Sequence, residues 1–276
     1  MPSTLRAIAG SAHLGPTLVV TTITVVLASA SELELWRVVV LGAMTLANQL
    51  SIGWSNDAID SARDRDAHRV DKPIVRGEVS SRTVMTLAVC AAVVAIALSL
   101  LLGPALAVVH AVALAAGWLY NARLKRGLSA TLCYMVGFGL IPLMITLARA
   151  DPRPAALWSI VVGGMLGLAA HFANVLPDLD DDERHGIRSL PHRLGARVSG
   201  AVALVALAAA SVLAVTSAGI VTPVMLVGAT ATLVLLAVGI IAVFRQPHSR
   251  LLFRLIMLAA LSVVVTLTGA ATAIVN

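Results

Sequence analysis

The sequence is poor in charged and in aromatic side chains. Only 12% of its 276 residues are Asp, Glu, Lys or Arg and only 4% are aromatic, whereas 59% are hydrophobic and the mean hydropathy is +0.93. Soluble domains usually carry about 25% charged residues. A soluble protein of this composition would have no means of covering its surface, so a soluble fold is excluded. A chain of this length can instead form roughly nine membrane spans of about 20 residues each.

Cysteine is also scarce. The chain has two, Cys90 and Cys133, and each lies inside an apolar run. Isolated thiols in such positions are typical of buried, inert residues. The sequence therefore favours neither a disulfide nor a cysteine-based metal site.

Apolar segments separated by short polar stretches fill the chain. They predict an all-α polytopic bundle of nine transmembrane helices that forms a single domain over residues 1–276. The segments lie at about 13–30, 36–56, 80–102, 104–122, 128–148, 155–176, 194–217, 220–244 and 250–274. The first one also resembles a signal peptide, with Arg6 before it and Ala28-Ser29-Ala30 at its end, but its apolar stretch is long for one.

The basic residues orient this bundle. If the N-terminus is cytoplasmic and the spans alternate, all but three of the 20 Lys and Arg residues fall in cytoplasmic stretches; the exceptions are Arg37, Arg149 and Arg153. Cytoplasmic loops of membrane proteins carry such an excess of basic residues. We therefore expect a multi-pass protein of the plasma membrane with its N-terminus inside and its C-terminus outside. The net charge of +6 then indicates orientation and not a nucleic-acid partner.

The acidic residues are unevenly distributed. Of the 14 Asp and Glu residues, all but Glu32, Glu34 and Asp151 lie in two cytoplasmic segments, 57–78 and 178–183. Neighbouring carboxylates repel each other unless cations lie among them. The clustering therefore indicates a chemical role for both segments.

The first acidic segment continues the second apolar run. Asn56, Asp60 and Asp64 recur every four residues, so on a helix they form one stripe about 12 Å long. Oxygen ligands of this kind suit Mg²⁺ and not Zn²⁺. The alternative is a solvated helix end whose charge is neutralised by the arginines at positions 63–69.

The second acidic segment follows the sixth apolar run. Five of the six residues from 178 to 183 are acidic, and Pro177 is expected to break or kink the helix just before them. Asp178 and Asp182 share a face if the backbone stays helical. We expect the two segments, on the same side of the membrane, to face each other across a central cavity as a two-metal clamp around a phosphorylated ligand.

With these motifs the sequence resembles the UbiA superfamily of membrane prenyltransferases. The Asp-rich segments of that family are matched over about 56–80 and 174–195. The matching residues are Asn56, Asp57, Asp60 and Asp64 with the continuation Asp71 to Ser80; Asp178 and Asp182 with Gly186, Ser189 and Gly195; and Tyr120 with Lys125 and Arg126. The sequence departs from the family at three positions, with Ser61 and Lys72 where arginine is usual and Asn121 where proline is usual.

The resemblance implies an enzyme that transfers a prenyl group from an isoprenyl diphosphate to a small aromatic or lipophilic acceptor, with Mg²⁺ as cofactor and the active site on the cytoplasmic side. It implies that Asp60, Asp64, Asp178 and Asp182 are catalytic and bind the metal together with Asn56. It implies that the diphosphate is bound by Lys125, Arg126, Arg63 and Lys72. His171 and Asn174, one or two turns before Asp178, are candidates for the acceptor pocket.

Three other functions are open to such a chain. A terpene cyclase of the same superfamily would ionise the same diphosphate without an acceptor. A transporter would need a polar path through the membrane, and both acidic segments lie on one side of it. A lipid-binding scaffold without catalysis would not require two metal-binding motifs.

Overall fold

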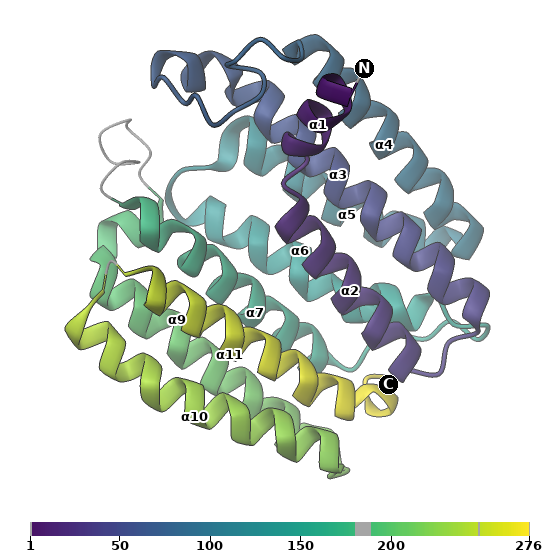
Figure 1. Ribbon diagram of the computed structural model, residues 1–276. Helices are drawn as coiled ribbons and strands as arrows, with labels where there is room; N and C mark the ends of the chain where they lie inside the picture. Colours follow the sequence, from purple (N-terminus) through teal and green to yellow (C-terminus); the bar gives the residue numbers. More distant parts are fainter. Residues whose placement is uncertain (1, 180–188, 248, 276) are drawn as a thin grey trace. The chain divides into compact units, whose positions relative to one another are not determined.

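The computed structural model describes residues 2–179, 189–247 and 249–275, which are almost entirely helical, with no β-strand in these ranges. The chain divides into two compact parts (Figure 1). One comprises Met1–Val26 and Glu34–Arg123, and the other Leu27–Leu33 and Leu124–Asn276.

The first part begins with a bent pair of helices. α1 covers Pro2–Gly10 and α2 covers Leu14–Ala30, the last residues of which belong to the other part. The two helices meet at 63°, and His13 at the bend has a left-handed backbone (φ 49°). The indole Nε1 of Trp54 donates to the carbonyl of Ile8 at 2.9 Å, which joins α1 to the third helix.

Three long helices complete the first part. α3 (Leu35–Asp66) packs along α4 (Ser81–Leu102), and α5 (Pro104–Leu119) continues into a short π-helix, Tyr120–Leu124. α3 has 32 residues, so it continues beyond the predicted span and carries the whole stripe of Asn56, Asp60 and Asp64. The predicted helical continuation of the second span is confirmed.

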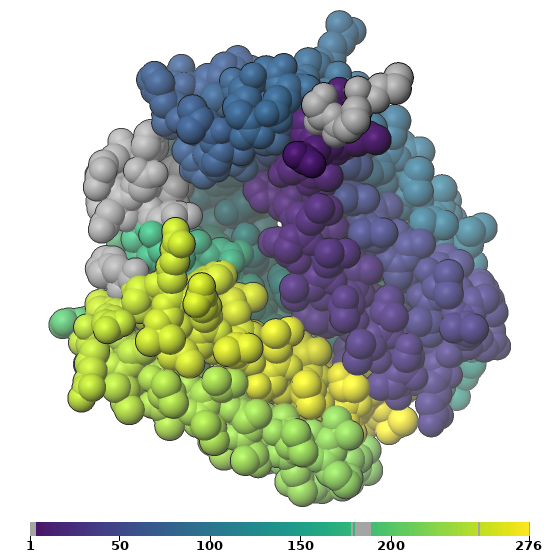
Figure 2. Space-filling view, viewed as in Figure 1, coloured from purple at the N-terminus to yellow at the C-terminus, as the bar shows by residue number. Residues whose placement is uncertain are grey.

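The second part contains five long helices. α6 covers Gly127–Leu147, α7 Leu157–Val175, α9 Leu190–Ser217, α10 Pro223–Arg245 and α11 Arg250–Gly269. α6 and α7 approach closely through glycines, since a Cβ on Gly163 would lie 2.6 Å from the carbonyl oxygen of Phe138. α10 and α11 lie side by side, as Figure 2 shows.

The predicted spans agree with these helices, with differences at their ends. Eight of the described helices are long and apolar enough to cross a membrane, and the bent pair Thr4–Gly10 with Leu14–Ala30 would make a ninth. The predicted break at Pro177 is confirmed, because α7 ends at Val175 and a 3₁₀ turn, Leu176–Asp178, follows.

At two ends the helices differ from the approximate predicted segments by four or five residues, for a common reason. α9 starts at Leu190 and not near 194, and it contains a kink at Gly195 (φ 75°). α11 ends at Gly269, and a 3₁₀ turn over Ala271–Ala273 follows where the sequence predicted continued helix. Hydropathy reports which residues suit the membrane, whereas backbone conformation decides where a helix starts, bends and stops.

Candidate metal and diphosphate site

The C-terminal end of α3 carries the predicted ligand stripe. Asn56, Asp60 and Asp64 lie on successive turns, and the Asp64 side chain is buried. The Arg63 guanidinium donates to Asp60 Oδ2 at 2.8 Å. Burying a carboxylate is costly unless a cation or hydrogen-bond donors compensate its charge. The stripe therefore combines three oxygen-bearing side chains, and a bound cation would compensate the charge of the buried Asp64 carboxylate.

Asn56 is held by a side chain that the sequence did not single out as functional. The Nδ2 of Asn56 donates to the Oδ1 of Asn121 at 2.9 Å, and Asn121 is itself buried in the π-helix. The Nδ2 of Asn121 donates to the carbonyl oxygen of Ile52 at 2.8 Å and to Ser55 Oγ at 2.9 Å. These contacts leave Oδ1 of Asn56 turned away from Asn121.

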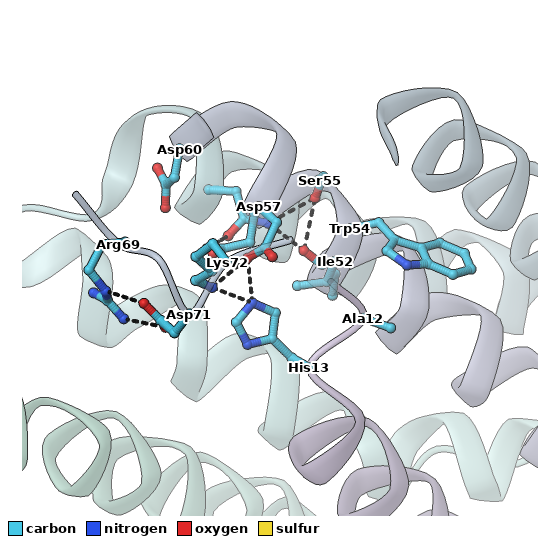
Figure 3. A network of polar contacts seen from close by, with 12 residues as sticks. Ala12, His13, Ile52, Trp54, Ser55, Asp57, Asp60, Arg69, Asp71 and Lys72 are labelled. Atoms are coloured by element: carbon cyan, nitrogen blue, oxygen red, sulfur yellow. Dashed lines mark hydrogen bonds and ion pairs between the residues drawn. The ribbon is translucent and has the colours of Figure 1, made fainter. Parts of the chain in front are cut away.

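Asp57 is next to the stripe but has a different environment. Lys72 Nζ and His13 Nε2 each lie 2.7 Å from its Oδ1, and its side chain is only 2% exposed. Figure 3 shows Lys72 and His13 pointing at Asp57, with Asp60 standing apart from these contacts. Lys72, which the resemblance assigns to the diphosphate, is thus bound to a carboxylate of the protein. Sequence reasoning missed His13, for which the sequence has no signal.

The loop that carries Lys72 is ordered by its own ion pairs. Arg69 makes two hydrogen bonds to Asp71, at 3.1 and 3.2 Å, and these lower the pKa of that carboxyl. Arg76 likewise binds Glu78, at 2.6 and 2.9 Å, and lowers its pKa. Arg76 also donates to the carbonyl of Val70 at 2.8 Å. The loop therefore has a defined shape and can hold the lysine in place.

The apolar side of this loop packs against three helices. A small buried cluster combines residues of α1, α3, the loop and α4: Ala7, Ala58, Ile74, Val79 and Val84. The end of α3 is thus fixed by packing on one side and by the Asp57 ion pairs on the other.

The remaining predicted residues belong to the second part. Lys125 is half-buried and Arg126 exposed just before α6, where Ser129 Oγ donates to the Arg126 carbonyl at 2.7 Å. His171 is buried in α7 with its ring 4.9 Å from that of Tyr134, and Asn174 is exposed. The backbone of Asp178 ends the 3₁₀ turn, and Asp182 lies outside the described residues.

The donor set fits Mg²⁺ in an open site. Over the described ranges, no three His, Cys, Asp or Glu side chains are close enough together to enclose a metal. Mg²⁺ does not require such a cage, because it usually keeps several waters and binds through one or two carboxylates and the phosphates of a substrate. The amide oxygen of Asn56 and the carboxylates of Asp60 and Asp64 meet that need.

Together, the helices and the stripe define a polytopic α-helical membrane protein with three oxygen-bearing side chains, of a kind that suits a cation, at one end of a long apolar helix. The model of the UbiA prenyltransferase family matches residues 16–264. The chain belongs to the UbiA prenyltransferase family.

One curated relative is similar in sequence. The bacteriochlorophyll synthase 33 kDa chain of Cereibacter sphaeroides is 32% identical over 198 residues, which are 66% of this chain and 63% of the relative. The match thus covers a little less than two thirds of the relative's length.

Solved structures share the fold at low sequence identity. A UbiA homologue of Aeropyrum pernix K1 superposes with a TM-score of 0.74 at 19% identity, over 90% of this chain and 95% of that one. A digeranylgeranylglyceryl phosphate synthase superposes with a TM-score of 0.73 at 12% identity, over 98% of this chain and 99% of that one. A UbiA homologue of Archaeoglobus fulgidus, bound to GPP and Mg²⁺, superposes with a TM-score of 0.64 at 13% identity, over 98% of this chain and 99% of that one.

Proposed function

We propose that this protein is a Mg²⁺-dependent intramembrane prenyltransferase that moves a prenyl group from an isoprenyl diphosphate to a small aromatic or lipophilic acceptor. The observation that carries the proposal is the stripe of Asn56, Asp60 and Asp64 on one continuous helix at the end of a span. Membership of the UbiA family and the likeness to a homologue that binds GPP and Mg²⁺ support it.

The chain's own residues divide into two groups in this proposal. Metal ligands are Asn56, Asp60, Asp64, Asp178 and Asp182, and cationic contacts to the diphosphate come from Arg63, Lys125 and Arg126. Mg²⁺ bound there would offset the negative charge that develops on the leaving diphosphate. Lys72 supports the site indirectly, because its ion pair with Asp57 holds the end of α3. It can contact a phosphate only if it binds Asp57 and the phosphate together or releases Asp57.

The bilayer contributes to substrate binding. A prenyl tail that lies among apolar helices avoids contact with water, which is worth about 0.8 kcal/mol for each buried CH₂ group. With the active site on the cytoplasmic side of the plasma membrane, as the basic residues predict, the diphosphate stays in water while the tail lies in the membrane.

The acceptor is proposed from one relative. The likeness to a bacteriochlorophyll synthase chain favours a tetrapyrrole of the chlorophyll type among the lipophilic acceptors. The proposed acceptor-pocket residues are the buried His171, whose ring is tilted by 39° against that of Tyr134, and the exposed Asn174.

One assay tests the proposal. Purified protein in detergent is incubated with Mg²⁺, labelled prenyl diphosphates of several lengths and either a lipid extract or a panel of aromatic and tetrapyrrole acceptors. We expect diphosphate release that requires an acceptor and stops when EDTA removes the metal. A cyclised hydrocarbon formed without acceptor would identify a terpene cyclase instead. No release with any substrate would contradict both enzyme functions, and labelled-diphosphate uptake into proteoliposomes would then test for a transporter.

A further inference from the structure

The π-helix after α5 places one amide side chain against the ligand stripe. Asn121 is 3% exposed and occupies the position where the family resemblance has proline, which has no side-chain hydrogen-bonding group. Its amide makes hydrogen bonds to three groups of α3, at Ile52, Ser55 and Asn56. The departure from the family therefore adds specific hydrogen bonds where a proline could make none.

The orientation of the Asn121 amide follows from a backbone carbonyl. The oxygen of Ile52 can only accept hydrogen bonds, so the group of Asn121 that lies 2.8 Å from it must be the NH₂. Ser55 Oγ donates to the same carbonyl at 3.0 Å and so has a lone pair left to accept from Asn121. The Oδ1 of Asn121 is thereby directed at Asn56.

The same reasoning fixes Asn56. The Oδ1 of Asn121 faces Asn56 and can only accept a hydrogen bond. Asn56 must therefore present its NH₂ to Asn121, at 2.9 Å. The Oδ1 of Asn56 then points away from Asn121. If the Asn56 amide were turned by 180°, it would present NH₂ in place of the oxygen, and a protonated amide nitrogen is no ligand for Mg²⁺.

The Ile52 side chain packs closely against α5. A Cβ on Gly117 of α5 would lie 2.5 Å from Cδ1 of Ile52, so the two helices are in close contact beside this carbonyl. The hydrogen bonds that link Ile52, Asn121 and Asn56 therefore lie at a closely packed junction of α3 and α5.

We propose that Asn121 is a positioning residue that turns the amide oxygen of Asn56 towards the metal. The proposal rests on the proposed function for the identity of that metal. Residues that orient a metal ligand typically change metal affinity about 10- to 100-fold when they are removed.

The direct test measures metal binding and not turnover. Full-length protein in detergent is titrated with Mn²⁺ in the presence of inorganic diphosphate, and free Mn²⁺ is counted by electron paramagnetic resonance. We expect Asn121→Leu, which keeps the branching at Cγ and removes both hydrogen-bonding groups, to raise the Mn²⁺ dissociation constant about 10-fold or more. Asn121→Ala takes its place if the leucine variant does not fold.

A matched control lies on the same helix pair. Trp118 Nε1 donates to Ser51 Oγ at 3.0 Å, so Trp118→Phe removes an α3–α5 hydrogen bond without touching Asn56. We expect its Mn²⁺ affinity to equal that of the unmodified protein. If Trp118→Phe weakened Mn²⁺ binding as much as Asn121→Leu does, the proposal would be overturned, because a general loosening of the contact between α3 and α5 would explain both losses.

A double-mutant cycle separates orientation from structure. Asn56→Asp gives position 56 two equivalent oxygens, one of which then faces the Asn121 oxygen. With no NH₂ left to misplace, Asn121→Leu should cost little Mn²⁺ affinity, or restore some, in the Asn56→Asp background. The same loss in both backgrounds would contradict a positioning role.

The outcomes distinguish this proposal from the function on which it rests. If the unmodified protein neither binds Mn²⁺ with diphosphate nor releases diphosphate from substrates, the proposed function fails. If it does both, and folded Asn121→Leu binds Mn²⁺ as tightly, only the role of Asn121 is refuted.

Discussion

Asp57 and Asp60 are three residues apart on α3, and their partners differ. Asp57 is held by Lys72 and His13, whereas Asp60 is bound by Arg63 on the stripe side. The stripe could be predicted because the helical repeat is local. His13 and Asn121 could not, because their contacts join residues 44 and 65 positions apart, which only the packed chain brings together.

Replacing a stripe carboxylate should abolish turnover and leave the fold intact. Asp60→Ala removes a proposed metal ligand, and we expect diphosphate release to fall at least about 100-fold, or ~2.7 kcal/mol in activation free energy. Asp182→Ala should do the same. The matched control is Asp66→Ala, an exposed acidic residue at the end of the same helix but outside the stripe. Full activity in both Asp60→Ala and Asp182→Ala would refute the metal assignment.

Removing Lys72 should destabilise the protein even without substrate. Lys72→Met leaves the buried Asp57 with only its contact to His13 Nε2, and breaking a buried ion pair costs up to about 3–5 kcal/mol. We expect a lower Tm in detergent, and recovery of most of the loss in the double variant Asp57→Asn, Lys72→Met. Arg82→Met, at an exposed position in the first turn of α4, should leave Tm unchanged. An unchanged Tm in Lys72→Met would favour a role in diphosphate binding alone.

At the scale of elements, the α1–α2 bend depends on one glycine of α3. A Cβ on Gly53 would lie 2.6 Å from the backbone oxygen of Ala12, and a backbone atom cannot move aside as a side chain can. Hydropathy predicts α2 and α3 but contains no information on such an approach. The contact matters for the site, because the bend presents His13 to Asp57.

Gly53→Ala should therefore destabilise the site end of the first part. We expect a loss of about 1–3 kcal/mol from overpacking, seen as a lower Tm in detergent. In Gly137→Ala on α6 the added Cβ would meet nothing within 4 Å, so that variant should keep the Tm or raise it slightly. Equal Tm values for both variants would show that α1 and α2 can move away from α3 at little cost.

For the whole molecule, composition and charge were enough to predict an all-helical membrane protein, and the eight long apolar helices with the bent pair agree with that prediction. The nine-span count depends on the bent pair, because α2 alone has 17 residues, fewer than the roughly 20 that a span needs. The bend between α1 and α2 could not be predicted from hydropathy, because it arises from the left-handed backbone conformation of His13.

Membrane orientation is open to direct measurement. In a background with Cys90→Ser and Cys133→Ser, a single cysteine is introduced as Asp66→Cys at the end of α3 or as Asp151→Cys between α6 and α7, both at exposed positions. The distribution of basic residues predicts a cytoplasmic α3 end, so a membrane-impermeant maleimide should label Asp151→Cys in intact cells and Asp66→Cys only in inverted vesicles. An odd number of spans separates the two positions, so labelling of both from one side would refute the alternating arrangement of helices. Labelling of Asp66→Cys from outside alone would reverse the orientation and place the proposed diphosphate site on the wrong side for a cytoplasmic substrate.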